Sequence, residues 1–191
     1  MDALTLLLER RSCHALQAPA PEGEALATIL RAAFRVPDFQ QLRPYEFILA
    51  AGDGLDRLGA LMEQAARAGG KPDDVIERSR RMPHRAPLVV IVVARVRAST
   101  IVSRLEQQLT AGCAVMAMQM AAVAQGFGGI WRSGWPMFDR GLHHALNLEP
   151  DDQIVGFLYL GTPRQSPPAA TPSADADAHV SPPPGLPTRE E

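Results

Sequence analysis

The sequence predicts an α+β fold in which helices flank a small sheet. About four runs have the β-branched, apolar composition of strands, and they lie among a larger number of segments with helical periodicity. Strands and helices do not alternate strictly along the chain, which argues against a doubly wound α/β fold. The length of 191 residues indicates one domain. We expect this domain to occupy residues 1–163 and a separate tail to follow at residues 164–191.

The composition excludes several classes of protein. A formal net charge of −2 gives no global basic field that would attract nucleic acid. The start MDALTLLLERR contains an acidic residue and no long apolar core, so it does not have the pattern of a signal peptide. Cys13 and Cys113 lie far apart and form no CxxC motif, which indicates neither a disulfide framework nor a zinc site. We therefore expect a cytoplasmic protein without a metal, a nucleic-acid partner or a membrane attachment.

The first half of the chain has mostly helical periodicity. Asp2 can cap a first helix whose leucines supply an apolar face and which ends in the segment ERRSCH, residues 9–14. Further helices are expected at residues 22–35, 55–68 and 73–81. A strand is expected at residues 46–51, before a Gly-Asp-Gly turn. The loop that leads into this strand, residues 36–45, reads VPDFQQLRPY and contains two prolines.

The second half contains the clearest strand and the longest helix. Residues 87–95, PLVVIVVAR, are β-branched and unbroken, so they predict a strand that is buried on both faces. A long helix follows from about residue 102. The remaining elements are expected to be a short strand at residues 129–132, a helix at 139–146 and a last strand at 154–160. From Pro163 onward the chain is rich in Pro, Ala, Ser and Thr, which predicts disorder.

The long helix is the most distinctive part of the sequence. Between residues 111 and 124 nearly every side chain is Ala, Val, Met, Cys or Gly, and Gln119 is the main interruption. A helix that is apolar on all sides is normally buried on all sides. The run is shorter than a membrane span and carries this central glutamine, so we reject a transmembrane helix. Its many alanines would allow close contact with another helix, including one of a second subunit.

Glycines follow the long helix directly. Gly126 is expected to end the helix, because glycine readily adopts the left-handed conformation found at helix C-termini. Gly128 and Gly129 could let backbone N–H groups face a flat ligand without an intervening side chain. A plain turn between a helix and a strand explains the same spacing, and spacing alone slightly favours it.

Two groups of arginines have both a structural and a functional interpretation. Arg10 and Arg11, together with Ser12, could bind a phosphate monoester, whose charge and geometry match two guanidinium groups and a hydroxyl. Arginines at a helix C-terminus also complement the helix dipole without any ligand. A second group is expected to form a solvated face, with contact to a nucleotide phosphate as the alternative. This second group consists of Arg78, Arg80, Arg81 and Arg85.

Several catalytic motifs do not occur in the sequence. The segment GFGGIW lacks the third glycine of GxGxxG and follows a helix instead of a strand, so the dinucleotide-binding fingerprint fails. There is no P-loop, GxSxG or HExxH motif. His143 and His144 are adjacent, so on a helix they point about 100° apart and make a poor metal pair. A reactive thiol at Cys13, beside two arginines and His14, is a further hypothesis, but no base can be assigned to it.

Three segments and the long helix together resemble the nitroreductase family, and its smallest members in particular. The segments are RRS at residues 10–12, GFGGIWRSG at 126–134 and VGFLYLGTP at 155–163. The resemblance covers roughly residues 1–163 in matching order and spacing, and its most specific part is the long helix joined to GGIWRSG. It implies a nitroreductase-like fold with a mainly antiparallel sheet and an intertwined homodimer.

The resemblance implies flavin chemistry. The family binds FMN without covalent attachment, in two sites at the interface of the homodimer. It takes hydride from NADH or NADPH and passes reducing equivalents, in a ping-pong cycle, to nitroaromatics, quinones or similar acceptors. The resemblance therefore implies an NAD(P)H-dependent oxidoreductase in which no side chain is required as a catalytic acid or base, since the chemistry occurs on the flavin.

The resemblance also assigns site residues by position. Arg10, Arg11 and Ser12 would hold the phosphate and ribityl end of the flavin. Gly128 and Gly129 would lie beside the isoalloxazine, with a backbone N–H near its reactive nitrogen. The wall of that subunit would be completed by Trp131, Arg132 and Ser133. The nicotinamide would be bordered by Ala121, Ala122, Val123, Ala124, Gln125 and Gly126.

The second subunit would contribute Arg35 and Phe39 to the same flavin.

The sequence departs from the family pattern near the flavin. His14, expected near the flavin ring, stands where much of the family has Lys or Arg, and Phe39 stands where close relatives have His. The tripeptide RPY at residues 43–45 replaces the usual Gln-Pro-Trp. These departures leave open a flavin-binding carrier or sensor without turnover, and a helical dimerisation module that binds nothing is a third alternative.

Overall fold

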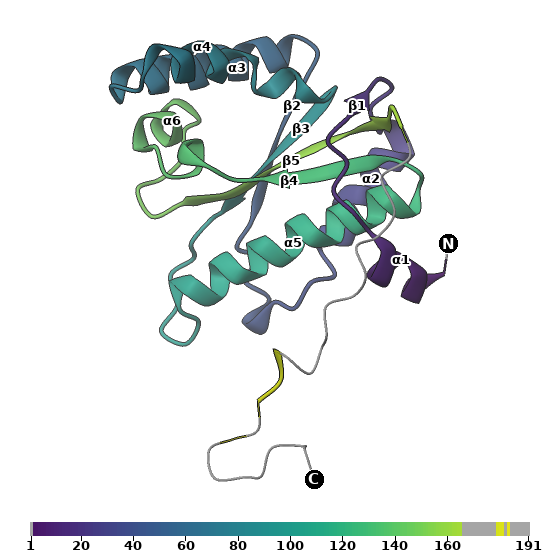
Figure 1. Cartoon of the computed structure of the whole chain (residues 1–191). Coiled ribbons are helices and arrows are strands. Elements are labelled where there is room, and N and C mark those ends of the chain that lie inside the picture. The colour runs from purple at the N-terminus through teal and green to yellow at the C-terminus, as the bar shows by residue number, and fades with distance from the viewer. Residues whose placement is uncertain (1, 166–178, 182, 184–191) are drawn as a thin grey trace.

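The computed structural model describes residues 2–165, 179–181 and 183 (Figure 1). The helices and strands lie between Ala3 and Pro163, in the part of the chain for which we expect the folded domain. The disorder predicted from Pro163 onward is wrong at its start, because Pro163 ends the strand β5 and the Arg164 amide donates to the Ala15 carbonyl at 2.9 Å. For the rest of the tail it stays a prediction, as does the domain boundary at residue 163, because most of residues 164–191 lie outside the described part.

Five strands of the described chain form one antiparallel sheet. The strands are β1 (Leu16–Gln17), β2 (Glu46–Ala51), β3 (Leu88–Ala94), β4 (Gly128–Arg132) and β5 (Gln153–Pro163). β5 pairs with β1, β3 and β4, and β3 continues the sheet to β2. The predicted α+β class with a small sheet is therefore confirmed. The sequence does not predict β1, because a strand of two residues has no alternation to detect.

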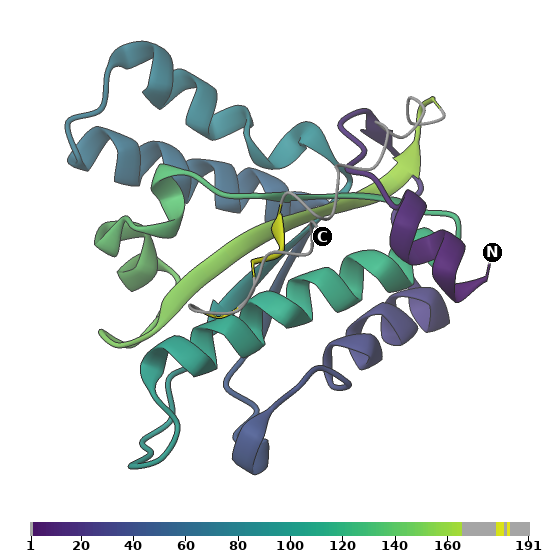
Figure 2. The same cartoon turned by 60° about the horizontal axis from the view of Figure 1, so that its bottom comes forward.

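Helices cover both faces of the sheet (Figure 1, Figure 2). On one face lie α3 (Asp53–Ala68), α4 (Asp73–Arg81) and α6 (Arg140–Ala145), and on the other lie α2 (Gly23–Ala33) and α5 (Arg104–Ala124). α1 (Ala3–Glu9) lies outside these layers, near the C-terminal end of α5. All the expected helices are present, and their ends differ from the expected ones by at most two residues.

β3 joins the two halves of the hydrophobic core. All of its residues are buried, as the sequence predicts, because successive side chains of a strand point to opposite faces. Val89, Ile91 and Val93 pack into the cluster under α3 and α6. Val90 and Val92 pack into the cluster under α2 and α5. The centre of the sheet therefore has no solvent-facing side.

Local signals fix both ends of α5. Ser103 and Glu106 form a capping box at its start, in which the Ser103 hydroxyl accepts from the Glu106 amide. At its end Gly126 has a φ of 86°, and the Phe127 amide donates to the Ala122 carbonyl at 3.0 Å. This Schellman arrangement confirms Gly126 as the helix stop. The S-x-x-E motif that begins at Ser103 is the sequence signal for the helix start.

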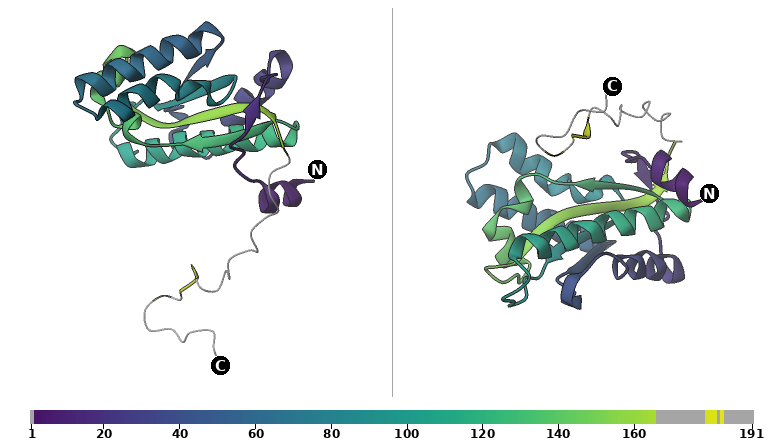
Figure 3. Two further views of the ribbon diagram at one scale, coloured as in Figure 1. Left: turned by 45° about the horizontal axis from the view of Figure 1, so that its top comes forward. Right: turned by 90° about the horizontal axis from the view of Figure 1, so that it is seen from below.

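The expectation that α5 is buried on all sides is wrong for a single chain. Met118 faces the sheet and is buried, but Leu109 is 60% exposed. The sheet covers one side of α5 and α2 lies beside it, so a third side faces outward (Figure 3). This outward side forms a shallow apolar groove, the α5 groove, together with β4 and β5. Its lining residues are Leu105, Gln108, Leu109, Gly112, Cys113, Met116, Trp131 and Val155.

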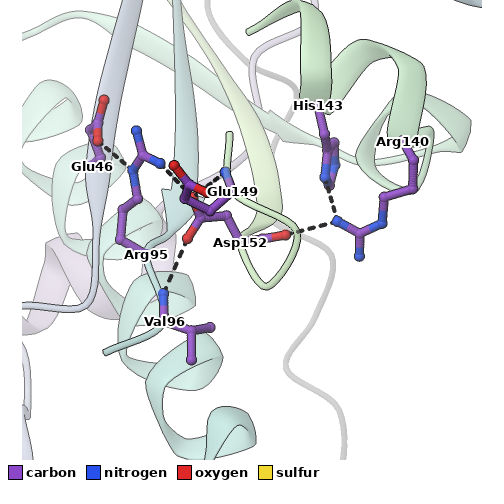
Figure 4. A network of polar contacts seen from close by, with 7 residues as sticks. All are labelled: Glu46, Arg95, Val96, Arg140, His143, Glu149 and Asp152. Carbon is purple, nitrogen blue, oxygen red and sulfur yellow. Dashed lines mark hydrogen bonds and ion pairs between the residues drawn. The ribbon is translucent and has the colours of Figure 1, made fainter. Parts of the chain in front are cut away.

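A polar network ties together the end of the sheet where β2 and β5 begin (Figure 4). The buried carboxylate of Asp152 accepts a 2.5 Å hydrogen bond from Arg95 and two more from backbone amides. Arg95 also donates to Glu46 at 2.5 Å, and its backbone amide donates to the Pro44 carbonyl. The network therefore fixes the base of the loop at residues 36–45.

Buried His143 extends this network to α6 (Figure 4). Its Nε2 lies 2.9 Å from the Met137 carbonyl, and its Nδ1 lies 2.7 Å from Arg140, which also donates to the Asp152 carbonyl. An arginine only donates, so Nδ1 accepts and Nε2–H donates, which is the neutral form of the ring. Burial, more than any other cause, lowers the pKa of His143 below its ordinary value of 6.5.

We expect the free energy of unfolding to fall as the pH drops through about 6.5. The unfolded chain binds a proton on this histidine near pH 6.5, whereas the folded chain binds it only at its lower pKa. The contribution of neutral His143 to the free energy of unfolding is therefore complete above about pH 6.5 and is lost as the pH falls through the window between 6.5 and the folded-state pKa. Each pH unit inside the window costs at most about 1.4 kcal/mol. Urea unfolding between about pH 5.5 and 8 should give a flatter profile for His143→Gln than for exposed His144→Gln. Identical profiles for these two variants would contradict this assignment.

Candidate functional site

The N-terminal segment, β4 and α5 meet along one edge of the sheet. The amide of Cys13 donates to the Gly129 carbonyl at 2.9 Å, and the side chain of Gln119 in α5 donates to the same oxygen at 2.8 Å. The Cys13 side chain also packs against Gly128. These contacts hold residues 10–14, which carry the predicted phosphate ligands, directly against β4.

Both glycines of β4 pack closely against other parts of the chain. A Cβ at Gly128 would lie 2.7 Å from Leu16 Cδ2 and 3.0 Å from Cys13 Cβ. A Cβ at Gly129 would lie 3.0 Å from Leu160 Cδ2. On their side-chain faces, both glycines therefore lie against protein atoms, and whether a flat ligand meets their backbone stays a prediction. A ligand would meet these residues at the backbone edge of β4.

A pocket of about 260 Å³ opens beside this edge. Its walls come from the end of α1 and the residues after it, from the C-terminal end of α5, and from the start of β4. The lining residues are Glu9, Arg10, Arg11, Cys13, Val123, Gly126, Phe127, Gly128 and Pro163. The fold thus brings Arg10 and Arg11 together with the glycine turn, and Ser12 lies exposed between Arg11 and Cys13.

The segment predicted to border the nicotinamide reaches this pocket in part. Val123 and Gly126 line it. Ala122 is fully buried in the core, and the side chain of Gln125 donates to backbone carbonyls in α2 and α5. Val123 and Gly126 therefore have a position that can face a ligand, and Ala122 does not.

Arg132 extends from β4 on the face that carries α3 and α6. Its guanidinium lies 3.3 Å from His14 Nδ1 and 5.9 Å from the centre of the Tyr159 ring. Within the described chain, its Nε is buried without a hydrogen-bond partner. Burial lowers the pKa of Arg132, and the nearby charge of Arg85 lowers it further. Such a half-buried cation is suited to an anionic or electron-rich group.

Trp131, the residue before Arg132, points to the opposite face because strand side chains alternate. Its indole N–H donates to the Val155 carbonyl at 3.2 Å, and the ring lies over Gly156, where a Cβ would be 2.0 Å from Nε1. The ring lines the α5 groove and is 39% exposed. The predicted wall of Trp131, Arg132 and Ser133 is therefore divided between two faces of the sheet, and Ser133 is exposed after β4.

Arg35 and Phe39 do not line the pocket of their own chain. They belong to the loop between α2 and β2, where Arg35 lines a separate cavity of about 350 Å³ and Phe39 is exposed. Gln40, Gln41 and Arg43 in this loop have φ values of 66°, 52° and 46°, a left-handed conformation that costs free energy in residues other than glycine. The loop therefore has a specific, strained backbone that presents Phe39 to the outside.

The second group of arginines is divided in the structure. Arg80 and Arg81 form ion pairs with glutamates at 3.0 and 3.1 Å, so they belong to a solvated face, as the main interpretation predicts. Arg85 lies beyond α4, and its charge acts on Arg132 and Tyr159. The sequence placed Arg85 at the exit of this helix but gave no sign of its interaction with Arg132 and Tyr159. The two prolines that flank Arg85 signal its departure from the helix, whereas nothing local connects Tyr159 with β4.

The structure does not support a metal site, a membrane span or a reactive thiol in the described part of the chain. Within the described residues, no group of His, Cys, Asp or Glu side chains could hold a metal ion, and no helix is long and apolar enough to cross a membrane. Cys13 is buried, with its Sγ 3.6 Å from the Ala15 carbonyl, which is the environment of a structural cysteine. The cytoplasmic location expected from the sequence stays a prediction.

Comparison with known proteins identifies the family. A sequence model of the nitroreductase family matches residues 7–162. The chain is 52% identical over 164 residues to YdjA of Escherichia coli strain K12, named provisionally as an NAD(P)H nitroreductase, with 86% of this chain and 90% of that protein covered. A nitroreductase-like protein from Bacillus cereus has the same fold, with a TM-score of 0.78 at 19% identity over 93% of this chain and 94% of that chain. A protein from Desulfovibrio desulfuricans, described provisionally as a nitroreductase and solved in complex with FMN, has a TM-score of 0.69 at 22% identity over 94% and 96%. The family match, the sequence identity and the shared fold together establish that this chain belongs to the nitroreductase family.

Proposed function

We propose that the chain is an FMN-dependent oxidoreductase that uses NADH or NADPH. The observation that carries the proposal is the edge of β4, where a pocket lined by Arg10 and Arg11 adjoins the strand that bears Arg132. The names of the relatives support it: YdjA is named provisionally as an NAD(P)H nitroreductase, and the Desulfovibrio protein was solved with FMN.

The residues on this edge fit FMN. Two guanidinium groups in one pocket match the charge of a phosphate monoester, and the Ser12 hydroxyl can add a hydrogen bond. Glu9 also lines the pocket, but two arginines face this one carboxylate, so the net charge stays positive. The buried Nε of Arg132, which lacks a partner in the described chain, fits an acceptor atom such as those on a flavin ring.

The chemistry would be that of the cofactor. Bound there, FMN would accept hydride from NADH or NADPH and deliver reducing equivalents, in a ping-pong cycle, to a nitroaromatic, a quinone or a similar acceptor. The residues of the chain bind and orient the cofactor: Arg10 and Arg11 offset the phosphate charge. Arg132 stabilises negative charge beside β4 more strongly than an exposed arginine would, because its surroundings are partly desolvated.

Two copies of the chain would form a homodimer that completes each site. The α5 groove is a contiguous apolar surface, and the α1 leucines Leu4, Leu7 and Leu8 are also exposed. Apolar patches of this kind mark interaction surfaces, and a second copy would bury both. The loop that carries Arg35 and Phe39 does not line the pocket of its own chain, so it is available to contribute to the site of the other copy.

The purified protein tests the proposal directly. We expect yellow protein that releases FMN on heating, and stopped-flow mixing with NADPH should bleach the flavin absorption. A flavin that stays oxidised for minutes would exclude the oxidoreductase function and favour a flavin-binding carrier or sensor. The departures from the family pattern at His14, Phe39 and Tyr45 are the reason for considering that alternative. Colourless protein that does not bind added FMN would contradict any flavin function.

Arg10→Ala should weaken FMN binding by about 1.5–3 kcal/mol, which raises the dissociation constant about 10- to 150-fold. The reason is the loss of a charge-assisted hydrogen bond in a pocket that is only partly open to water. Quenching of flavin fluorescence in a titration measures the constant. Arg78→Ala, which removes an exposed arginine from α4, is the matched control and should bind FMN normally. An equal loss in both variants would remove Arg10 from the phosphate site.

A further inference from the structure

We propose that Gln119 is a positioning residue of the flavin site. It holds the Gly129 carbonyl and, through that oxygen, keeps the arginine-bearing N-terminal segment in place beside β4. The proposal rests on the flavin function proposed above. It assigns to Gln119 no contact with the cofactor, only control over the segments that would bind it.

The first observation is the burial of a polar side chain in an otherwise apolar helix. Gln119 is 2% exposed, and its neighbours in the sequence of α5 are Met118 and Met120. Burial of an amide group costs free energy unless the group is hydrogen-bonded, so an apolar side chain at this position would be cheaper. A specific hydrogen bond must therefore offset the cost of burying the glutamine. Its Nε2 donates one to the Gly129 carbonyl at 2.8 Å.

The second observation is that three segments converge on this one oxygen. The Gly129 carbonyl accepts from Gln119 and, at 2.9 Å, from the amide of Cys13. A carbonyl has two acceptor sites, so both are used. Arg10 and Arg11 precede Cys13 by three and two residues, so the position of the Cys13 amide directly affects the positions of both arginines.

The third observation is that Gln119 lies directly behind the pocket. A Cβ at Gly129 would be only 3.3 Å from Gln119 Cγ, so the glutamine side chain covers that glycine. One helical turn further along α5, Val123 lines the pocket itself. The glutamine thus connects the helix, the strand and the arginine segment from the inner side, without taking up space in the pocket.

Removal of the Gln119 side-chain amide should loosen the arginine-bearing segment before Cys13 without unfolding the chain. Without Gln119 the carbonyl keeps the Cys13 hydrogen bond, so no buried polar group is left unpaired. The carbonyl loses the second donor that fixes its direction, so the segment before Cys13 should open more often. Both arginines would then spend less time in the position that binds phosphate.

Gln119→Met tests the proposal, with Gln107→Met as the matched control. Methionine keeps the length of the side chain and removes the donor. Gln107 has the same type and lies in the same helix, is 1% exposed, and donates to the carbonyls of Arg97 and Val102 at 2.9 and 3.3 Å, far from the pocket. The three proteins are compared in FMN titrations, in visible circular dichroism of the bound flavin, and in amide hydrogen exchange of the flavin-free chain.

We expect Gln119→Met to raise the FMN dissociation constant about 5- to 20-fold and to alter the circular dichroism of bound flavin. In the flavin-free chain, exchange of the Cys13 amide should be about 10-fold faster. Gln107→Met should lower the melting temperature but leave the FMN constant and the Cys13 exchange unchanged. Wild-type affinity and exchange in Gln119→Met, or equal losses in both variants, would overturn the proposal. If wild-type protein binds no FMN, the flavin function fails, and the exchange comparison still decides whether Gln119 positions the segment.

Discussion

In the homodimer proposed above, Leu109→Arg is expected to separate the two copies and to release the proposed flavin. Leu109 lies in the α5 groove and is 60% exposed in the single chain, so the arginine can be solvated in the monomer and the fold should change by less than about 0.5 kcal/mol. In the dimer the same guanidinium would be buried without a partner, which costs several kcal/mol. We expect the dimer dissociation constant to rise by about 100-fold or more.

Sedimentation velocity measures the oligomeric state of Leu109→Arg, and absorption measures the flavin that copurifies. Ala60→Arg is the control, because it adds the same charge to an exposed position of α3 on the other side of the sheet. It should remain dimeric and yellow. A Leu109→Arg protein that stays dimeric would show that the α5 groove is not the interface. A monomer that retains full FMN affinity would show that the second copy contributes nothing to the site.

Asp152→Ala is expected to give the largest loss of stability of the substitutions considered for this fold. The Asp152 side chain is 4% exposed and accepts from Arg95 and from two backbone amides. Its removal takes the acceptor away from these three partly buried donors, and the loss of one partner from a buried ion pair typically costs about 3–5 kcal/mol. Arg95 is 21% exposed and keeps Glu46, so we expect the lower end of this range, with a melting temperature lower by about 6–12 °C.

Asp151→Ala is the matched control for this prediction. Asp151 is the adjacent residue, is 70% exposed and pairs with exposed Arg104. A surface ion pair contributes about 0–1 kcal/mol, so its removal should change the melting temperature little. Because Arg95 also holds the base of the loop at residues 36–45, Asp152→Ala should in addition weaken FMN binding in the dimer. Similar melting temperatures for the two variants would show that the network in Figure 4 does not support the fold.

The elements of the fold could be predicted because their signals are local. The capping carboxylate of Asp2, the β-branched run of β3 and the left-handed Gly126 each act on residues within about one helical turn or along one strand. β1 could not be predicted, because its two residues are a strand only through their pairing with the end of β5. The exposure of the α5 groove could not be predicted either, because it depends on which sides of the helix the sheet and α2 leave uncovered.

The candidate site was predicted only in outline. The resemblance indicated residues 10–12 and 126–134, and the fold brings Arg10, Arg11 and Gly128 to one pocket. It did not indicate on which face of the sheet Trp131 and Arg132 each lie, nor that the paired glycines pack against Leu16 and Leu160. These facts depend on the register of β4 against β5, which one strand alone does not encode.

The sequence by itself determined the helices, the longer strands, the capping of the long helix and the family. The tertiary structure decided which residues share a site. Cys13 meets Gly129, Gln119 meets the same carbonyl, and Arg132 meets Tyr159, although none of these pairs is adjacent in the chain. The physical reason is range: backbone preferences and caps act over a few residues, whereas these contacts form only when strands have paired in register and helices have packed on the sheet.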